Sequence, residues 1–230
     1  MELGLFTQPV HRAEKPWATA LAEDRESVLL AEKLGFSEVW IGEHFSTKAE
    51  QIPSPLMFLA SLIEQTSTIR FATGVINLPY HHPVIVAAET AQFDQMSGGR
   101  LILGFGPGGL MSDAELFGME DMPERYRVAM ESIDIILALW NAEAPLRFDG
   151  EHFPMTLERR VWLSHGVGRM AETFQKPHPP VALAMVGPGG QTAETIAERD
   201  FIPISANFVP VSNLVAQWQS YAQTRERLGK

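Results

Sequence analysis

Residues 69–109 have the sequence IRFATGVINLPYHHPVIVAAETAQFDQMSGGRLILGFGPGG, which predicts a parallel βαβ unit. A strand from Ile69 leads through a loop to a helix from Pro83, and a second strand follows at Arg100–Phe105. A crossover helix of this length returns the chain in the direction of the first strand. Ligands of parallel α/β folds bind beyond the carboxyl ends of the strands. We therefore expect a binding site at residues 73–77 and 104–109.

The rest of the chain repeats this alternation. Further strands are predicted at 3–6, 37–42, 181–186 and 201–206, and further helices at 19–34, 55–65, 123–140, 193–199 and around 214–222. Six strands alternating with helices favour an α/β fold of the TIM (β/α)8-barrel type, in one domain over residues 1–230, with about six βα units present. The alternation breaks at about 141–180, where we expect an excursion over the barrel mouth that contains a small hairpin with an Asp149-Gly150 turn.

The predicted barrel is incomplete or truncated at its C-terminal end, because closure normally takes eight strands and about 250 residues. Three explanations are open. The chain is a fragment of a longer one, it is a reduced family member, or another subunit covers the open edge. Since an uncovered parallel edge strand favours aggregation, we expect a homo-oligomer or a repacked C-terminal region.

Composition limits the classes of partner. Hydrophobic residues make up 45% and charged residues 20% of the 230, as in ordinary globular proteins. The net charge of -10 disfavours binding to nucleic acid or to anionic membranes. There is no cysteine, which excludes disulfides, thiolate metal sites and a cysteine nucleophile. Neither a signal peptide nor an apolar run of about 20 residues is evident, so we expect a cytoplasmic protein.

Several short motifs could carry chemistry. Gly104, Gly106 and Gly109 have the spacing of a dinucleotide-binding turn, but a loop follows them instead of a helix. They either make room in a tight turn or allow a planar or phosphorylated ligand to approach. His44 follows the strand at 37–42 and either handles a proton near neutral pH or is a loop histidine bonded to backbone. The pair His81-His82 has no third ligand at a known spacing, so no metal site is predicted.

Two features suggest a phosphate site. The loop at 187–192 places backbone N–H groups and the Thr192 hydroxyl at the start of a helix, where free donors and the helix dipole favour an anion. Arg125, near the start of the long helix, either reaches a phosphate or is a solvated surface charge.

Four blocks of sequence resemble the bacterial luciferase-like flavin-dependent monooxygenases. They are Gly35–Trp40 leading to Gly42-Glu43-His44, Leu78–Pro83, Asp94–Arg100 and Gly104–Gly108. The resemblance runs over essentially the whole chain. The Gly-Pro-Gly after the fourth strand and the segment Pro177-His178-Pro179-Pro180 are most similar to the limonene-monooxygenase-like branch.

The resemblance implies a TIM barrel that binds reduced FMN at its mouth, supplied by a separate flavin reductase. Reaction with O2 would give a C4a-peroxyflavin that oxygenates a small apolar organic substrate. By position His44 matches the catalytic histidine, and Gly74-Val75 matches a non-prolyl cis peptide that packs against the flavin ring. The expected cofactor-binding residues are Gly74, Val75, Asn77, Gly106, Arg125, Gly189, Gly190 and Thr192. The alternatives are a deazaflavin (F420)-dependent hydride-transfer oxidoreductase on the same fold and a non-catalytic flavin-binding protein built on a shortened barrel.

Overall fold

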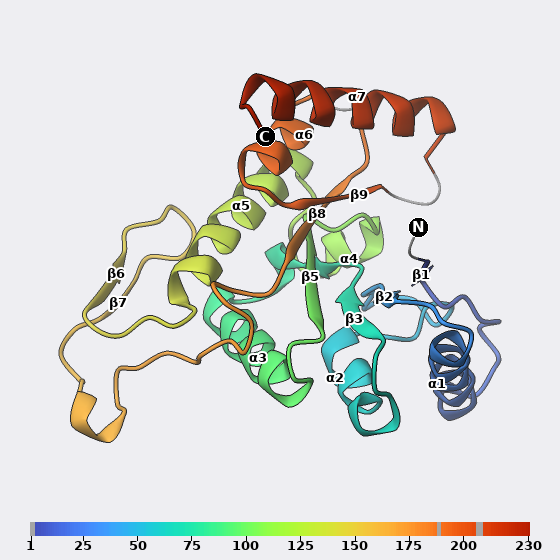
Figure 1. The fold of residues 1–230 in the computed structure, drawn as a ribbon, viewed down its shortest axis with the longest axis horizontal. Helices are drawn as coiled ribbons and strands as arrows, with labels where there is room; N and C mark the ends of the chain where they lie inside the picture. Colours follow the sequence, from blue (N-terminus) through green and yellow to red (C-terminus); the bar gives the residue numbers. More distant parts are fainter. Residues whose placement is uncertain (1–2, 188–189, 206–208) are drawn as a thin grey trace.

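The computed structural model describes residues 3–187, 190–205 and 209–230, and these form a parallel sheet curled into a half-barrel with helices along its outside (Figure 1). The strand order is β1-β2-β3-β5-β8-β9, and all of these neighbours are parallel. The strands are β1 (Gly4–Thr7), β2 (Glu38–Ile41), β3 (Arg70–Thr73), β4 (Ile76–Asn77), β5 (Leu101–Gly106), β8 (Val181–Met185) and β9 (Ile202–Ser205). No pairing joins β1 to β9 within the described residues, so both are edge strands. The predicted α/β class and the partial barrel are confirmed.

The helices lie close to the predicted positions. They are α1 (Trp17–Lys33), α2 (Pro55–Ala60), α3 (Pro83–Met96), α4 (Met111–Leu116), α5 (Met122–Leu139), α6 (Gln191–Glu198) and α7 (Val211–Arg227), with short 3-10 turns η1 (Ile63–Gln65), η2 (Leu78–Tyr80) and η3 (Leu163–His165). Ser54 caps α2 by accepting a hydrogen bond from the Met57 N–H, with Pro55 in the first turn. That helix ends five residues earlier than predicted, and α4 lies where a loop was expected. Among the described residues, no helix is both long and apolar enough to cross a membrane.

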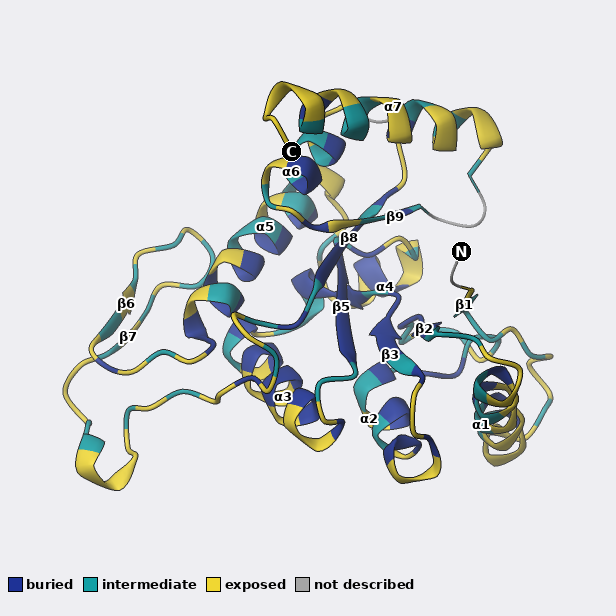
Figure 2. Ribbon diagram, in the orientation of Figure 1, coloured by how far each residue is buried: buried dark blue, intermediate teal, exposed yellow. Residues whose placement is uncertain are grey.

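Strand β5 separates two apolar clusters, and its six residues are all buried (Figure 2). Leu101, Leu103 and Phe105 point into the larger core between the sheet and the outer helices. Ile102 points the other way, into a smaller cluster with Trp40, Ala72, Ala182 and Ile204 inside the half-barrel. Because successive side chains of a strand alternate between faces, Gly104 and Gly106 lie on this inner face. The glycines keep the upper part of the interior clear of side chains.

A β-bulge interrupts the edge that β3 and β4 present to β5. Ala72 pairs with Ile102 and Ile76 pairs with Phe105. From Ala72 to Ile76 the chain advances four residues, whereas from Ile102 to Phe105 the paired strand β5 advances three. One extra residue therefore lies between β3 and β4. Thr73 fills the gap in the ladder, because its Oγ1 accepts from Gly104 N at 2.9 Å and donates to Gly104 O at 2.8 Å.

The predicted hairpin is present, but its turn is longer than expected. Strands β6 (Leu146–Phe148) and β7 (Met155–Leu157) are antiparallel, and Phe148 pairs with Met155. Six residues therefore connect the strands, and the two-residue Asp149-Gly150 turn is wrong. The reason is tertiary: Glu131 of α5 accepts hydrogen bonds from the N–H groups of His152 and Phe153 and holds the connection open.

The excursion at 141–180 lies against outer helices and not over the mouth of the half-barrel (Figure 1). Besides the contact to Glu131, Gln175 donates its N–H to Asp94 of α3 at 2.8 Å. None of the described residues that line the large cavity comes from this segment. The expectation of an excursion over the mouth is therefore corrected.

Candidate active site

A cavity of about 970 Å³ opens at the carboxyl ends of the parallel strands. This volume is at the upper end of the range for ligand pockets. Six of the nine predicted site residues line it, namely His44, Gly74, Val75, Asn77, Gly106 and Thr192. The strand ends and the start of α6 bring them together from four separate stretches of sequence. Among the described residues, no Lys or Arg lines the cavity, while Glu43 and Glu50 do.

One wall of the cavity is made of small apolar groups from the bulge and β5. The Gly74-Val75 peptide is cis, as the family resemblance implies. A Cβ added at Gly106 would lie 2.6 Å from Cγ2 of Val75, so the glycine is required for this close packing. Phe6 and Ile204 continue the wall on either side. The result is a largely apolar surface on which a planar ring could lie.

His44 lies between two carboxylates at the end of β2. Its Nε2 is 2.8 Å from Oε2 of Glu50, and its Nδ1 is 3.5 Å from Oδ2 of Asp113. Asp113 is completely buried and accepts hydrogen bonds from the backbone N–H groups of Phe45 and Ser46 and from the Ser46 hydroxyl. Through these bonds α4 holds the loop that carries His44.

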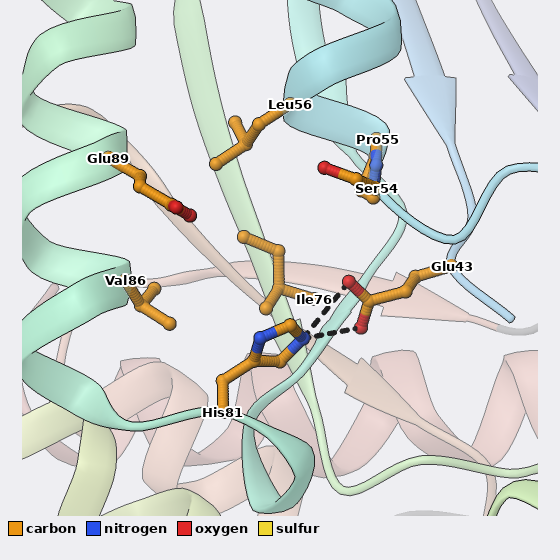
Figure 3. Close-up of a pocket in the computed structure, with 8 residues that line it drawn as sticks. All are labelled: Glu43, Ser54, Pro55, Leu56, Ile76, His81, Val86 and Glu89. Atoms are coloured by element: carbon orange, nitrogen blue, oxygen red, sulfur yellow. Dashed lines mark hydrogen bonds and ion pairs between the residues drawn. The ribbon is translucent and has the colours of Figure 1, made fainter. Parts of the chain in front are cut away.

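Glu43, which lines the cavity, ties the end of β2 to Asn77 at the end of β4 and also pairs with His81; Figure 3 shows the pair with His81. Its carboxylate accepts from Asn77 N at 2.8 Å and lies 3.1 Å from Nε2 of His81, while Asn77 Nδ2 donates to Glu43 O at 2.9 Å. Glu43 is 3% exposed. A buried carboxylate without such partners would be costly, so the pair with His81 is a structural requirement of this corner. His82 caps α3 by accepting the N–H of Val84.

The pair makes stability depend on pH. Burial disfavours the charged imidazole, but the hydrogen bond and the charge of Glu43, helped by Glu89, outweigh it and raise the pKa of His81. This stabilisation is fully present below the unfolded-state value of about 6.5 and is lost as pH rises through the higher folded-state pKa. As pH rises through this window, the free energy of unfolding should therefore fall more in the wild-type protein than in His81→Gln. The difference should be no more than the roughly 1.5–3 kcal/mol of a hydrogen bond to a charged group.

Urea denaturation at several pH values from 6 to 9 would measure this difference. His165→Gln is the matched control, because His165 is exposed in η3 and distant from Glu43. A pH dependence in His81→Gln equal to that of wild type would contradict the assignment.

The predicted phosphate end is assembled in part. Thr192 and Gln191, at the start of α6, line the cavity. The Gly190 N–H donates instead to the hydroxyl of Ser220 at 3.2 Å. Gly189 lies outside the described residues. The first turn of α6 therefore supplies the groups that could bind an anion here.

Arg125 is buried and does not line the cavity. Its Nη1 donates to the backbone carbonyl of Met119 at 2.6 Å, and the side chain is 1% exposed. The surface-charge alternative is therefore wrong, and the guanidinium anchors the connection between α4 and α5. The neighbouring Tyr126 lines the cavity instead, with a buried hydroxyl that has no hydrogen-bond partner among the described residues.

These residues fit a flavin mononucleotide in outline. The apolar wall suits the ring, the start of α6 suits a phosphate, and the orphaned Tyr126 hydroxyl suits a polar group of the ligand. Sequence reasoning missed Glu50, Asp113 and Tyr126 as parts of the site. The four-residue step from Met122 to Tyr126 in the helical stretch could have indicated that Tyr126 faces the cavity. Glu50 lies in an irregular loop and gave no signal.

Comparison with known proteins identifies the family. The sequence profile of the family described as luciferase-like monooxygenase matches residues 1–230. The chain belongs to this family. The family predicted from the four sequence blocks is confirmed.

Two curated family members illustrate the relationship. The chain is 30% identical over 235 residues to 4-hydroxyprotoasukamycin monooxygenase of Streptomyces nodosus subsp. asukaensis, covering 100% of this chain and 60% of that protein. It is 39% identical over 143 residues to limonene 1,2-monooxygenase of Rhodococcus erythropolis, covering 62% of this chain and 37% of that protein. The chain thus spans about 60% or less of the length of these relatives. The likeness to a limonene monooxygenase agrees with the predicted branch.

A third relative is the oxygenase component of the flavin-dependent trigonelline monooxygenase of Acinetobacter baylyi, 28% identical over 161 residues, which cover 69% of this chain and 41% of that protein.

Solved structures share the fold. The oxygenating constituent of 3,6-diketocamphane monooxygenase from Pseudomonas putida, solved with FMN, has a TM-score of 0.87 at 24% identity and covers 100% of this chain and 63% of its own. An F420-dependent secondary alcohol dehydrogenase has a TM-score of 0.75 at 20% identity, with 100% and 65% covered.

Proposed function

We propose that this chain is the flavin-binding part of a monooxygenase that uses reduced FMN and O2 to oxygenate a small apolar organic substrate. The observation that carries the proposal is the cavity itself, in which an apolar wall at Gly74, Val75 and Gly106 stands beside His44. Reduced FMN would supply two electrons, one oxygen atom would enter the substrate and the other would leave as water. The named activities of the monooxygenase relatives support this reaction class.

Each group of residues has a definite role in the proposal. The apolar wall binds the ring and excludes water from the reacting centre. Asn77, held by Glu43, adds a polar contact at the ring edge, and Thr192 with the start of α6 binds the phosphate. His44 takes or gives the proton that the reaction requires. We assign no phosphate contact to Arg125, because it is buried, does not line the cavity and donates through Nη1 to the carbonyls of Met119 and Glu120.

Hydride transfer with F420 is the second candidate, since an F420-dependent enzyme shares the fold. The lining of the cavity disfavours it. F420 carries a phosphodiester and glutamate carboxylates, whereas the described lining has two glutamates and no Lys or Arg. Like charges at close range are unfavourable. FMN, with a single phosphate, suits the lining better.

A separate flavin reductase is the expected partner, because the trigonelline relative is named as the oxygenase component of its system. Such a partner would deliver reduced FMN to this chain. We also keep the expectation of a homo-oligomer, because β1 and β9 are edge strands among the described residues.

A cofactor titration tests the proposal. Under anaerobic conditions, reduced FMN should bind with a dissociation constant in the micromolar range or below and F420 should bind at least about tenfold more weakly, a difference of about 1.4 kcal/mol. Oxygen labelled with ¹⁸O would then be admitted with aldehyde, ketone and terpene substrates. Labelled product supports the proposal. Selective F420 binding would favour hydride transfer, and FMN binding without any product would favour a non-catalytic flavin protein.

A further inference from the structure

Glu50 is the acidic side chain that meets His44 inside the cavity. It lies in the connection between β2 and α2, and its Oε2 is 2.8 Å from Nε2 of His44. The side chain is 25% exposed, but Oε2 itself is buried, and its contact to Nε2 is not aligned as a hydrogen bond, so Oε2 has no hydrogen-bond partner among the described residues. Because a buried carboxylate oxygen requires a partner, Nε2 of His44 at 2.8 Å is the donor that a small rotation of either side chain would bring into a hydrogen bond with it.

The backbone on both sides of Glu50 is fixed to other parts of the fold. The carbonyl of Ala49 accepts the N–H of His11 at 2.7 Å, and the carbonyl of Gln51 accepts the indole N–H of Trp17 at 2.8 Å. The loop after β1 and the first residue of α1 thus hold the two neighbours of Glu50. The position of its carboxylate beside His44 is set by these contacts and is not left to a free loop.

The other nitrogen of His44 faces a carboxylate that is already engaged. Nδ1 is 3.5 Å from Oδ2 of Asp113, beyond the usual length of an N–H···O hydrogen bond. Asp113 accepts from Phe45 and Ser46, and Nδ1 is buried without a hydrogen-bond partner among the described residues. The third acidic group nearby, Glu43, is bonded to Asn77 and His81. The two nitrogens therefore differ in their surroundings.

We propose that Glu50 is a positioning residue that accepts the Nε2–H of His44 and thereby fixes the orientation and the tautomer of the neutral ring. The inference deepens the proposed function, on which the role of His44 depends. Hydrogen bonding at one ring nitrogen decides which nitrogen carries the proton. The role resembles that of the third group in a hydrolase triad, which orients its histidine without reacting itself.

Nitrogen NMR of the flavin-free protein tests the tautomer directly. With ¹⁵N-labelled histidine, the signals of His44 would be assigned by their loss in His44→Gln. In neutral wild-type His44 we expect the Nε2–H form to exceed the Nδ1–H form at least about tenfold, as a strong charge-assisted hydrogen bond predicts. Glu50→Ala should bring the ratio several-fold closer to unity. Glu50→Gln should restore it, because its amide oxygen can still accept the hydrogen bond.

The matched control is Glu26→Ala, at an exposed glutamate of α1, which should leave the spectrum of His44 unchanged. Predominant Nδ1–H in wild type would overturn the proposal, and this result needs no folded variant. An unchanged ratio in Glu50→Ala would overturn it as well. This NMR experiment contains no flavin, so its result does not depend on FMN binding or oxygenation. Failure of FMN binding or of oxygenation would contradict the proposed function alone.

A second readout follows once reduced FMN binding is established. Glu50→Ala should lower turnover about tenfold or more at unchanged FMN affinity, and Glu50→Gln should recover most of the rate, since the geometry of the acceptor is kept. Equal turnover in wild type and Glu50→Ala would contradict a positioning role even if the tautomer changed.

Discussion

Replacement of Gly104 by alanine should destabilise the protein by about 3 kcal/mol or more, which is at the upper end of the cost of overpacking. An added Cβ would lie 2.0 Å from the backbone oxygen of Thr73 and 3.2 Å from Cδ1 of Ile204. The nearest obstacle is backbone, which cannot rotate away as a side chain can. Relief would require β3 and β5 to separate at the point where Thr73 Oγ1 bonds to both backbone groups of Gly104.

Guanidinium denaturation at neutral pH would measure the change. Gly109→Ala is the matched control, because no atom lies within 4 Å of its added Cβ and it requires no left-handed backbone. We expect a change within about 0.5 kcal/mol there, as at ordinary surface positions. Equal midpoints for Gly104→Ala and Gly109→Ala would show that the bulge is not rigid.

Replacement of His44 by alanine should lower oxygenation turnover about 100-fold or more, the usual effect of removing a group that transfers a proton. Affinity for reduced FMN should change little, because the apolar wall and the start of α6 lie on other elements. Single-turnover absorbance and product analysis under O2 would separate binding from chemistry.

The control is His165→Ala, at an exposed histidine outside the cavity. It should retain wild-type turnover and cofactor affinity. Product formation by His44→Ala at the wild-type rate would remove His44 from the mechanism. Loss of FMN binding in the same variant would instead assign it a binding role.

The alternation of strands and helices was predictable because it depends on local patterns. Apolar runs such as Leu101–Phe105 form buried strands whichever neighbours they meet. Proline at the first turn and glycine after the last turn gave the bounds of α3 within a residue or two. The length of the hairpin connection was not predictable, since Glu131 is distant in sequence from the N–H groups that it accepts.

The candidate site also contains some residues that local sequence could predict and others that it could not. His44, Gly74, Val75 and Gly106 could be found because each directly follows or belongs to a strand at its carboxyl end. Asp113 lies in a six-residue helix, too short to show a helical period. The orientation of Arg125 depends on the carbonyl of Met119, which becomes available only when the preceding turn has formed. Such tertiary contacts leave no mark in local sequence.

The bulge between β3 and β4 determines which side chains of this segment point into the cavity. Phe71 belongs to the outer core and Ala72 to the inner cluster, so strict alternation would turn Val75 outward and Ile76 inward. With one extra residue, Gly74 and Val75 both line the cavity, Ile76 joins the outer core and Asn77 returns to the interior. A one-residue deletion at 73–75 would remove the bulge, so that Ile76 and Asn77 would keep their faces but only one residue instead of two would line the cavity between Ala72 and Ile76. The segment should therefore tolerate substitution far better than a change of length.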